Sequence, residues 1–297
     1  MTNVTPDNSA SPIEGLNARQ AQYWNSAATA GRWVTLQDRL DAFFAPLAHA
    51  ALDPAQPVTG EHVLDVGCGC GATVLELARR VGATGHVTGV DISAPMLARA
   101  RARVEEEGFP QVTLTLADAA THHFAPETLD LVFSRLGIMF FADPVAAFAN
   151  LRAALKPIGR LVVACIRTPT ENPFTMTAVN AARALLPPGA LVTAGPEEPG
   201  MFSFADPARV RRILEAAGFH DIVLSSHDLA LRLAGPGGAA EAAAFSVQFG
   251  PLARVLADVK AEVRQAIIEA VTQAYRRLET PDGIVLGGGF WIVTARP

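Results

Sequence analysis

The chain has 297 residues and a formal net charge of −5, and 50% of its residues are hydrophobic against 18% charged. This composition predicts a well-buried core and argues against disorder. No stretch gathers Lys and Arg along a path that would follow a phosphate backbone, so nucleic acid is not an expected partner.

The first residues are polar and lack the basic patch and apolar core of a signal peptide, and no apolar run is long enough to span a bilayer. We therefore expect a cytoplasmic protein without membrane insertion. Three cysteines do not form a disulfide framework. Cys68 and Cys70 lack the spacing and the His partners of a zinc site, so no bound metal is expected.

The N-terminal part is expected to be helical. Residues 1–12 are typical of a loose tail, apolar residues recur at helical spacing from 13 to 51, and a turn-rich linker covers 53–60.

Strands and helices then alternate as far as residue 166. The expected strands are 62–67, 85–91, 111–118, 129–136 and 159–166, and the helices between them are 72–81, 93–108 and 144–155. This alternation favours a mostly parallel sheet covered on both faces. Further along we expect helices at 178–186, 206–218 and 252–278 and strands at 221–233 and 290–296.

The segment VLDVGCGCG (63–71) ends the first strand in three closely spaced glycines. Gly67, Gly69 and Gly71 let a ligand approach the backbone where no Cβ intervenes, at the edge of the sheet where α/β proteins bind ligands. Two ligands use such a turn. A dinucleotide would rest its pyrophosphate on the helix N-terminus. S-adenosylmethionine carries an ammonium and a sulfonium, so it favours a nearby carboxylate, and Asp65 supplies one.

Two further carboxylates follow the next two strands. Asp91 lies about 20 residues beyond the glycines, where a carboxylate binds both ribose hydroxyls. Asp118 ends the third strand and is placed to accept from an adenine amino group. Together with Asp65, these residues favour S-adenosylmethionine over a dinucleotide.

These motifs resemble the class I S-adenosylmethionine-dependent methyltransferases, in the broad group that includes the ubiquinone/menaquinone C-methyltransferases. The resemblance rests on VLDVGCGCG, GVDIS, LADAATHHF, LDLVFSRLGIMFFADPVAAFANLRAALKPIGRL and FWIVTAR. It implies an α/β, Rossmann-like fold with a seven-stranded sheet in the order 3-2-1-4-5-7-6, strand 7 antiparallel and helices on both faces. Ile158 stands where the family usually has glycine, and we expect this to change a turn before strand 5.

The resemblance also implies which residues contact the cofactor. They are Asp65, Gly67, Gly69, Asp91, Ile92, Asp118, Ala119 and Ser134, to which we add Cys68, Met96 and Trp33. Trp33 belongs to an N-terminal lid expected over residues 1–60, and the methyltransferase domain is expected over 61–297. Substrate-side insertions are expected at about 168–205 and 236–282.

Methyl transfer from a sulfonium mainly requires that the two reactants be brought together and that water be excluded. A base is needed only for certain acceptors. The candidates for a base or an orienting group are His122, His123 and Arg135, with Glu171 and Asn172 next.

The side chains expected near the acceptor are largely apolar, which favours a small or medium-sized organic acceptor. Two alternatives remain: a protein that binds S-adenosylmethionine but is repurposed for another role, and an NAD-dependent oxidoreductase. The expected oligomeric state is a monomer or a homodimer.

Overall fold

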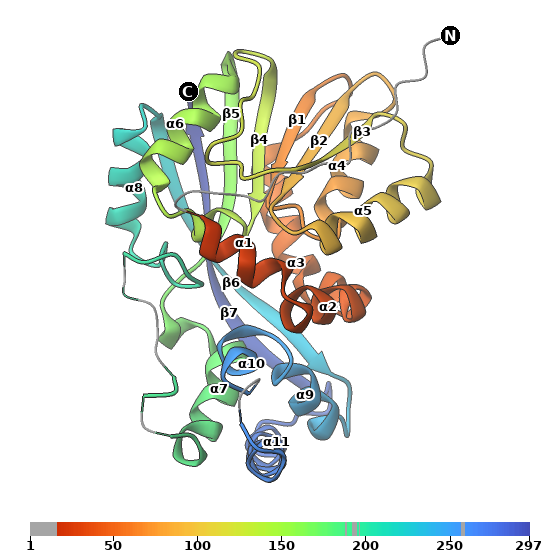
Figure 1. The fold of residues 1–297 in the computed structure, drawn as a ribbon, viewed down its shortest axis with the longest axis vertical. Helices are drawn as coiled ribbons and strands as arrows, with labels where there is room; N and C mark the ends of the chain where they lie inside the picture. The colour runs from red at the N-terminus through yellow and green to blue at the C-terminus, as the bar shows by residue number, and fades with distance from the viewer. Residues whose placement is uncertain (1–16, 188, 192–194, 196, 257–258) are drawn as a thin grey trace.

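The computed structural model describes residues 17–297 except 188, 192–194, 196 and 257–258. The expected tail at 1–12 and the first expected helical residues, 13–16, lie outside this part. Seven strands form one sheet in the order β3-β2-β1-β4-β5-β7-β6, with β7 antiparallel to both of its neighbours (Figure 1). The fold implied by the resemblance is therefore confirmed.

The strands are β1 (His62–Val66), β2 (His86–Asp91), β3 (Val112–Leu116), β4 (Leu129–Arg135), β5 (Leu155–Ile166), β6 (His220–Ala234) and β7 (Ile284–Arg296). The helices are α1 (Ala18–Asn25), α2 (Ala27–Thr35), α3 (Gln37–Ala55), α4 (Ala72–Val81), α5 (Ala94–Glu107), α6 (Pro144–Ala154), α7 (Pro173–Ala182), α8 (Pro207–Ala216), α9 (Ala239–Ser246), α10 (Gly250–Leu256) and α11 (Ala261–Arg276). Short 3₁₀ turns lie at Ile138–Phe140, Pro169–Glu171 and Arg183–Leu185.

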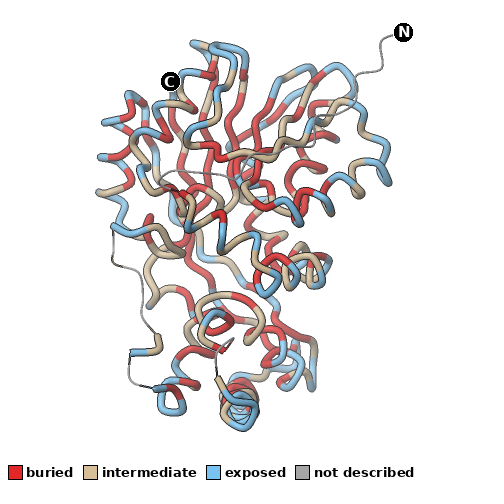
Figure 2. Tube along the Cα trace, viewed as in Figure 1, coloured by how far each residue is buried: buried red, intermediate tan, exposed pale blue. Residues whose placement is uncertain are grey.

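The central strands are buried along almost their whole length, as expected for a parallel sheet covered by helices (Figure 2). α4 packs on β1 and β2, α5 on β2 and β3, and α3 on the strands from β4 to β6. α6 and α8 pack against each other and cover β5 and β6. α3 is thus a core helix, while α1 and α2 lie at the edge where the parallel strands end (Figure 1).

β6 and β7 run well past the rest of the sheet. β7 pairs with β5 only between Phe290 and Ala295, whereas residues 284–289 pair with β6 alone. This two-stranded ribbon carries α9, α10 and α11, which with α7 form a separate group of helices, here called the cap (Figure 1). The cap has its own buried side chains, so it is a second packed layer on the ribbon (Figure 2).

Two expected elements differ from the structure. The long helix expected at 252–278 is two helices, α10 and α11, and the apolar side of α11 is covered by α9 and α7. The helix expected at 178–186 begins earlier, at Pro173, and ends in a 3₁₀ turn. Pro173, in the first turn of α7, is a local start signal that helical spacing alone does not reveal.

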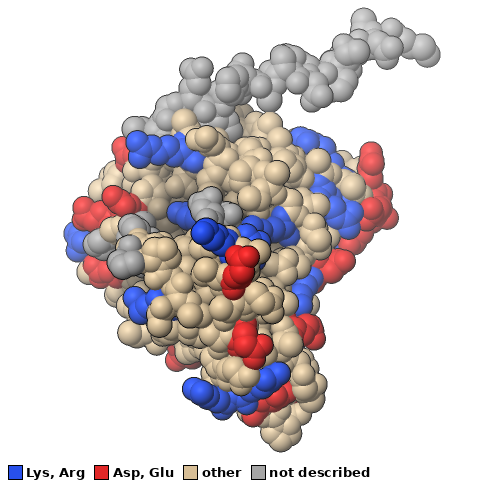
Figure 3. Space-filling model, turned by 60° about the horizontal axis from the view of Figure 1, so that its bottom comes forward, with Lys and Arg blue, Asp and Glu red and all other residues tan. Residues whose placement is uncertain are grey.

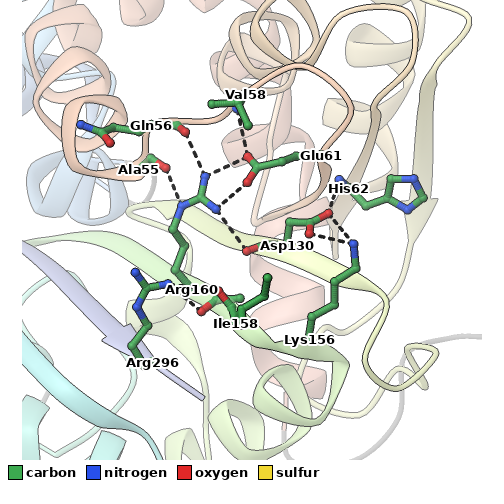
Figure 4. Close-up of polar contacts among 11 residues, drawn as sticks. Ala55, Gln56, Val58, Glu61, His62, Asp130, Lys156, Ile158, Arg160 and Arg296 are labelled. Carbon is green, nitrogen blue, oxygen red and sulfur yellow. Dashed lines mark hydrogen bonds and ion pairs between the residues drawn. The ribbon is translucent and has the colours of Figure 1, made fainter.

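Ile158 also lies differently from the expected turn. It belongs to β5 itself, is 84% exposed, and its carbonyl accepts a hydrogen bond from Arg296 at 3.2 Å (Figure 4). Nearby, Arg160 forms a two-pronged ion pair with Glu61 at 2.7 and 2.8 Å and donates to the carbonyl of Ala55 at 2.6 Å. These contacts fasten the linker after α3 to the amino-terminal edge of the sheet, opposite the edge at which β1 delivers the glycine loop.

Candidate cofactor-binding site

The glycine loop between β1 and α4 has the backbone that its sequence predicts. Gly67, Gly69 and Gly71 have φ angles of +71°, +54° and +87°, which side chains other than glycine rarely adopt. A Cβ on Gly67 would lie 2.7 Å from the Cα of Gly137, so the loops after β1 and β4 are in backbone contact. A Cβ on Gly69 would meet only the sulfur of Met96, at 3.9 Å.

The N–H groups of this loop are already used within the protein. Gly67 and Cys68 donate to the carbonyl of Val90, Gly69 donates to Asp91, and Gly71 donates to the carbonyl of Cys68. A pyrophosphate needs free N–H groups at such a turn. These four N–H groups are therefore not free to bind a pyrophosphate, and the buried Asp65 carboxylate beside the loop would repel one.

Asp65 at the end of β1 is completely buried. Its Oδ2 accepts a hydrogen bond from the Thr73 hydroxyl at 2.5 Å, while its Oδ1 has no hydrogen-bond partner. Burial raises the pKa of Asp65 to about 7, against the opposing effects of the Thr73 hydrogen bond and the positive charge of Arg135. A buried carboxylate with an unpartnered oxygen is suited to a cationic ligand group.

Asp91 ends β2 and is held by two backbone donors. Gly69 donates to Oδ2 at 2.7 Å and Ser93 donates to Oδ1 at 2.8 Å, which fixes the carboxylate across the glycine loop. Burial raises its pKa, and these two hydrogen bonds act in the opposite direction. Each carboxylate oxygen keeps further acceptor capacity, as a pair of ribose hydroxyls would require.

Asp118, beyond β3, is covered by the start of α1. The Asn17 side chain donates to both oxygens of Asp118 at 2.9 Å and accepts from the backbone N–H of Ala142, also at 2.9 Å. An amide that donates to Asp118 and accepts from a backbone N–H has the same polarity as the amino edge of an adenine. Asn17 is thus placed where the resemblance puts the base.

The rest of α1 is fastened to the same edge. Asn25 donates to the carbonyl of Ile92 and accepts from the N–H of Ala94, and the Ser93 hydroxyl donates to the carbonyl of Trp24. Ser93 precedes α5, but its side chain does not cap the helix because it makes this contact instead. α1 therefore lies directly over the ends of β2 and β3.

Aromatic rings link α1 and α2 to the loop after β4. The Trp24 ring packs edge-on against Phe140 at 5.1 Å and against Trp33 at 5.9 Å, and it also contacts Tyr23 at 5.1 Å. The carbonyl of Trp33 lies 4.0 Å from the sulfur of Cys70 in the glycine loop. α1 and α2 therefore lie over the loop, whereas α3, which the expected lid at 1–60 also includes, packs on the sheet.

The remaining expected contact residues lie around the same edge. The Ser134 hydroxyl donates to the carbonyl of Val66 at 2.7 Å, which joins the ends of β4 and β1. Cys68, Met96 and Ala119 are buried, and Ile92 is partly buried. Burial raises the pKa of the Cys68 thiol well above its usual value and that of the Cys70 thiol to about 12, so neither is a thiolate at neutral pH.

The expected catalytic candidates differ in their surroundings. Arg135 ends β4 next to the glycine loop. His122 and His123 follow Asp118; His122 packs against the ring of Phe124, and His123 is exposed. Glu171 forms an ion pair with Arg167. Asn172 is fully buried and binds the backbone at Arg167, Thr168 and Gly289, so it has a structural role.

Two groups at the site were missed by sequence reasoning. Thr73 lies eight residues after Asp65, in the first turn of the following helix, and this spacing is a signal that could have been used. Asn17 meets Asp118 across 101 positions of the chain, and no local pattern predicts that contact.

The residues present fit S-adenosylmethionine. Carboxylates stand at the ends of three adjacent strands, and the one beside the glycine loop has an unpartnered oxygen. Within the described residues, no three His, Cys, Asp or Glu side chains are grouped so as to hold a metal ion. None of the described helices has the length and apolar character needed to cross a bilayer.

Comparison with known proteins agrees with this assignment. A methyltransferase-domain family model matches residues 63–159. The chain is 33% identical over 196 residues to the nocamycin O-methyltransferase of Saccharothrix syringae, covering 64% of this chain and 70% of that protein. It is 39% identical over 125 residues to the aklanonic acid methyltransferase DauC of a Streptomyces species, covering 42% of this chain but only 57% of that protein.

A solved structure has a similar fold. The Haemonchus contortus phosphoethanolamine N-methyltransferase 2, bound to phosphomonomethylethanolamine and S-adenosylhomocysteine, aligns with a TM-score of 0.55 at 19% identity. The alignment covers 96% of this chain and 61% of that one. At this identity the likeness concerns the fold alone.

Proposed function

Because this chain belongs to the S-adenosylmethionine-dependent methyltransferases, we propose that it transfers the methyl group to a small or medium-sized, largely apolar organic acceptor by in-line displacement. When bound, S-adenosylmethionine supplies a methyl group on a sulfonium, which needs little further activation. The protein has to hold the two reactants in line and keep water out.

The single observation that carries the proposed acceptor class is an aromatic cluster between α3 and the cap. The Phe43 ring of α3 lies 5.7 Å from Phe174, 5.5 Å from Phe245 and 5.6 Å from Phe249, all three in or beside cap helices. Phe44, the next residue of α3, lies under the guanidinium of Arg135 at 5.5 Å. The apolar cluster therefore reaches the end of β4, beside the glycine loop, where an acceptor would meet the methyl group.

The surface and the relatives also support a small acceptor. Figure 3, which turns the cap forward, shows a largely uncharged face with separate small groups of each sign. No continuous basic track crosses that view, as a nucleic-acid substrate would require. Two relatives are named for aklanonic acid and nocamycin, which are small organic molecules.

We assign roles to the described residues on this basis. Asp91 would bind the ribose hydroxyls, Asp118 the adenine edge, and Asp65 the positively charged end. Trp24 and Trp33 would exclude water from above. His122 and His123 remain the candidates for accepting a proton, if the acceptor is a hydroxyl or a carbon acid.

The proposal is tested by incubating the protein with S-adenosylmethionine and an acceptor panel. Aklanonic acid is a named probe, and a fractionated cell extract supplies the others. We expect S-adenosylhomocysteine to accumulate only when an acceptor is present, together with a product heavier by one methyl group. Asp91→Asn should abolish both signals, while Asp221→Asn, at an exposed position at the opposite edge, should not.

The alternatives give different results. A repurposed protein would bind S-adenosylhomocysteine without forming it from any acceptor, which would overturn the proposed reaction. An NAD-dependent oxidoreductase would bind NADH more tightly than S-adenosylhomocysteine in equilibrium titrations, and the occupied N–H groups of the glycine loop predict the reverse order.

A further inference from the structure

Two oppositely charged groups at the ends of β1 and β4, the Asp65 Oδ1 and the Arg135 guanidinium, are left without a hydrogen-bond partner. The Asp65 Oδ1 is buried and accepts no hydrogen bond. Within the described part of the chain, the Arg135 guanidinium makes no hydrogen bond or ion pair, and its one recorded side-chain contact is with the ring of Phe44. The two are near enough that the Arg135 charge acts on the pKa of Asp65, yet they do not pair. Isolated charges in such positions are costly unless a ligand satisfies them.

Arg135 lines a cavity of about 170 Å³ on the face of the sheet shared by α3, α4 and α5. The other cations in its lining are engaged: Arg103 pairs with Asp41 at 2.8 Å, and Arg79 pairs with Glu76. Arg135 is thus the guanidinium of this cavity that makes no hydrogen bond or ion pair with a described residue. Burial lowers the pKa of Arg135, the negative charges of Asp41 and Asp65 act in the opposite direction, and a negative ligand group would add to their effect.

The first turn of α4 also faces the cavity. Ala72, the first residue of the helix, is one of the lining residues. The N–H groups at the start of an α-helix have no partners within the helix and carry a partial positive charge. The helix start and the free guanidinium therefore both favour an anionic group at the same place.

The order of strands says which part of the cofactor lies here. Asp118, Asp91, Asp65 and Arg135 lie at the carboxyl ends of β3, β2, β1 and β4, which are consecutive neighbours in the sheet. Four neighbouring strands span about 14 Å from first to last. With adenine at Asp118 and ribose at Asp91, the amino-acid end of the cofactor falls at β1 and β4. That end carries an ammonium and a carboxylate.

We propose that Arg135 binds the carboxylate of the cofactor's amino-acid end, beside an Asp65 that faces its positive charge. The inference rests on the proposed function for its ligand and makes Arg135 a cofactor-binding residue instead of the acceptor-orienting group expected from the sequence. It explains why Asp65 and Arg135 remain apart: each is the counter-charge for one half of a zwitterion.

The test compares two probes by calorimetric titration. S-adenosylhomocysteine has the amino-acid end, and 5′-methylthioadenosine keeps the adenosine and the sulfur but lacks it. A charge-assisted hydrogen bond corresponds to about 10- to 100-fold in affinity. We expect Arg135→Gln to weaken S-adenosylhomocysteine by about that factor and to change 5′-methylthioadenosine less than about threefold. Arg135→Lys, which keeps the charge but loses the two-pronged geometry, should lie between.

Arg79→Gln is the matched control, because Arg79 lines the same cavity but is exposed and already paired with glutamates. It should leave both affinities unchanged. Binding of 5′-methylthioadenosine by Arg135→Gln also reports that this variant is folded. Equal weakening of both probes, or no weakening of S-adenosylhomocysteine, would overturn the inference while leaving the proposed function standing. Failure of the unmodified protein to bind S-adenosylhomocysteine would overturn both. If Arg135→Gln raised only the KM for the acceptor, Arg135 would be an acceptor-orienting residue, as expected from the sequence.

Discussion

The two ends of the cofactor site are built in opposite ways. At the adenosine end, the chain satisfies its own polar groups: Asn17 covers Asp118, Asn25 covers the carbonyl of Ile92, and backbone N–H groups hold Asp91. At the proposed amino-acid end, one oxygen of Asp65 and the guanidinium of Arg135 have no hydrogen-bond partner among the described residues. A ligand arriving at the adenosine end exchanges one set of hydrogen bonds for another, whereas at the amino-acid end it adds new ones. We therefore expect the amino-acid end to contribute more of the net binding free energy.

The largest expected effect comes from the loop beneath the amino-acid end. Gly67→Ala introduces a Cβ 2.7 Å from the Cα of Gly137 and also forces a side chain into a positive φ. We expect a loss of about 2–4 kcal/mol in the free energy of unfolding and no measurable binding of S-adenosylhomocysteine. Denaturant unfolding and calorimetry measure the two.

Gly108→Ala is the control for Gly67→Ala. Gly108 ends α5 with a φ of +70°, almost the same as at Gly67, but nothing lies within 4 Å of its Cβ position. We expect a loss of about 1 kcal/mol from the backbone alone and normal binding. Equal losses at the two positions would show that the backbone contact with Gly137 has no consequence.

Charge removal at each end should separate the two regions. Asp65→Asn should weaken S-adenosylhomocysteine by about 10- to 100-fold and leave 5′-methylthioadenosine nearly unchanged, because only the first has a charged end. Asp118→Asn should weaken both ligands by the same smaller factor, about 3- to 10-fold. Calorimetric titration of both variants with both probes measures the four affinities. The comparison fails if Asp118→Asn discriminates between the ligands and Asp65→Asn does not.

The pH dependence of binding should also differ between S-adenosylhomocysteine and 5′-methylthioadenosine. Because burial raises the pKa of Asp65 to about 7, the free protein holds a proton there below pH 7, while the ammonium group of the ligand favours the ionised carboxylate. Thr73, Arg135 and Asp91 are the groups that act on it. We expect the affinity for S-adenosylhomocysteine to rise about tenfold from pH 6 to pH 8, with no such rise for 5′-methylthioadenosine or for Asp65→Asn. A flat profile for the unmodified protein would contradict the raised pKa.

The same shift predicts how stability depends on pH. Between about pH 4 and pH 7, the folded protein keeps the Asp65 proton that the unfolded chain releases, so the free energy of unfolding of the ligand-free protein falls as pH rises through this window. Asp65→Asn should remove that part of the decline. Denaturant titrations at several pH values measure the free energy of unfolding of both proteins. If it declined equally with pH in the unmodified protein and in Asp65→Asn, the prediction would be contradicted.

The smallest expected effect is a gain in ligand affinity. Asn17→Ala frees both oxygens of Asp118, so an adenosine ligand no longer competes with α1 for them. We expect both probes to bind about two- to fivefold more tightly, because less of the protein is held in the covered state. Gln22→Ala, on the exposed side of the same helix, should change nothing. Weaker binding by Asn17→Ala would mean that Asn17 helps to hold the ligand instead of replacing it.

Much of the sheet could be predicted from local patterns. The alternating strands and helices up to residue 166 and the glycine loop follow from hydrophobic runs bounded by glycine, while the strand order followed from the resemblance. The division between α10 and α11 in the cap could not be predicted from the apolar pattern. Helical spacing continues across that division and gives no sign of it.

The site was predicted in part, for a related reason. Asp65, Asp91 and Asp118 each lie at the end of a strand, and the ends of neighbouring parallel strands must meet at one edge. The cover by α1 could not be predicted, since the contact between Asn17 and Asp118 depends on how a distant helix crosses that edge. The same holds for Arg135, whose lack of a partner is visible only in three dimensions.

The ribbon formed by residues 228–234 of β6 and 284–289 of β7 gives the molecule a modular design. These residues pair only with each other, and the stretch between them, 235–283, contains α9, α10 and α11 and none of the carboxylates at the strand ends. Exchange of that stretch for its counterpart in a relative would therefore alter acceptor choice while the nucleoside contacts stay as they are. Selectivity and cofactor use would then be inherited separately, and the ribbon marks where a graft should be joined.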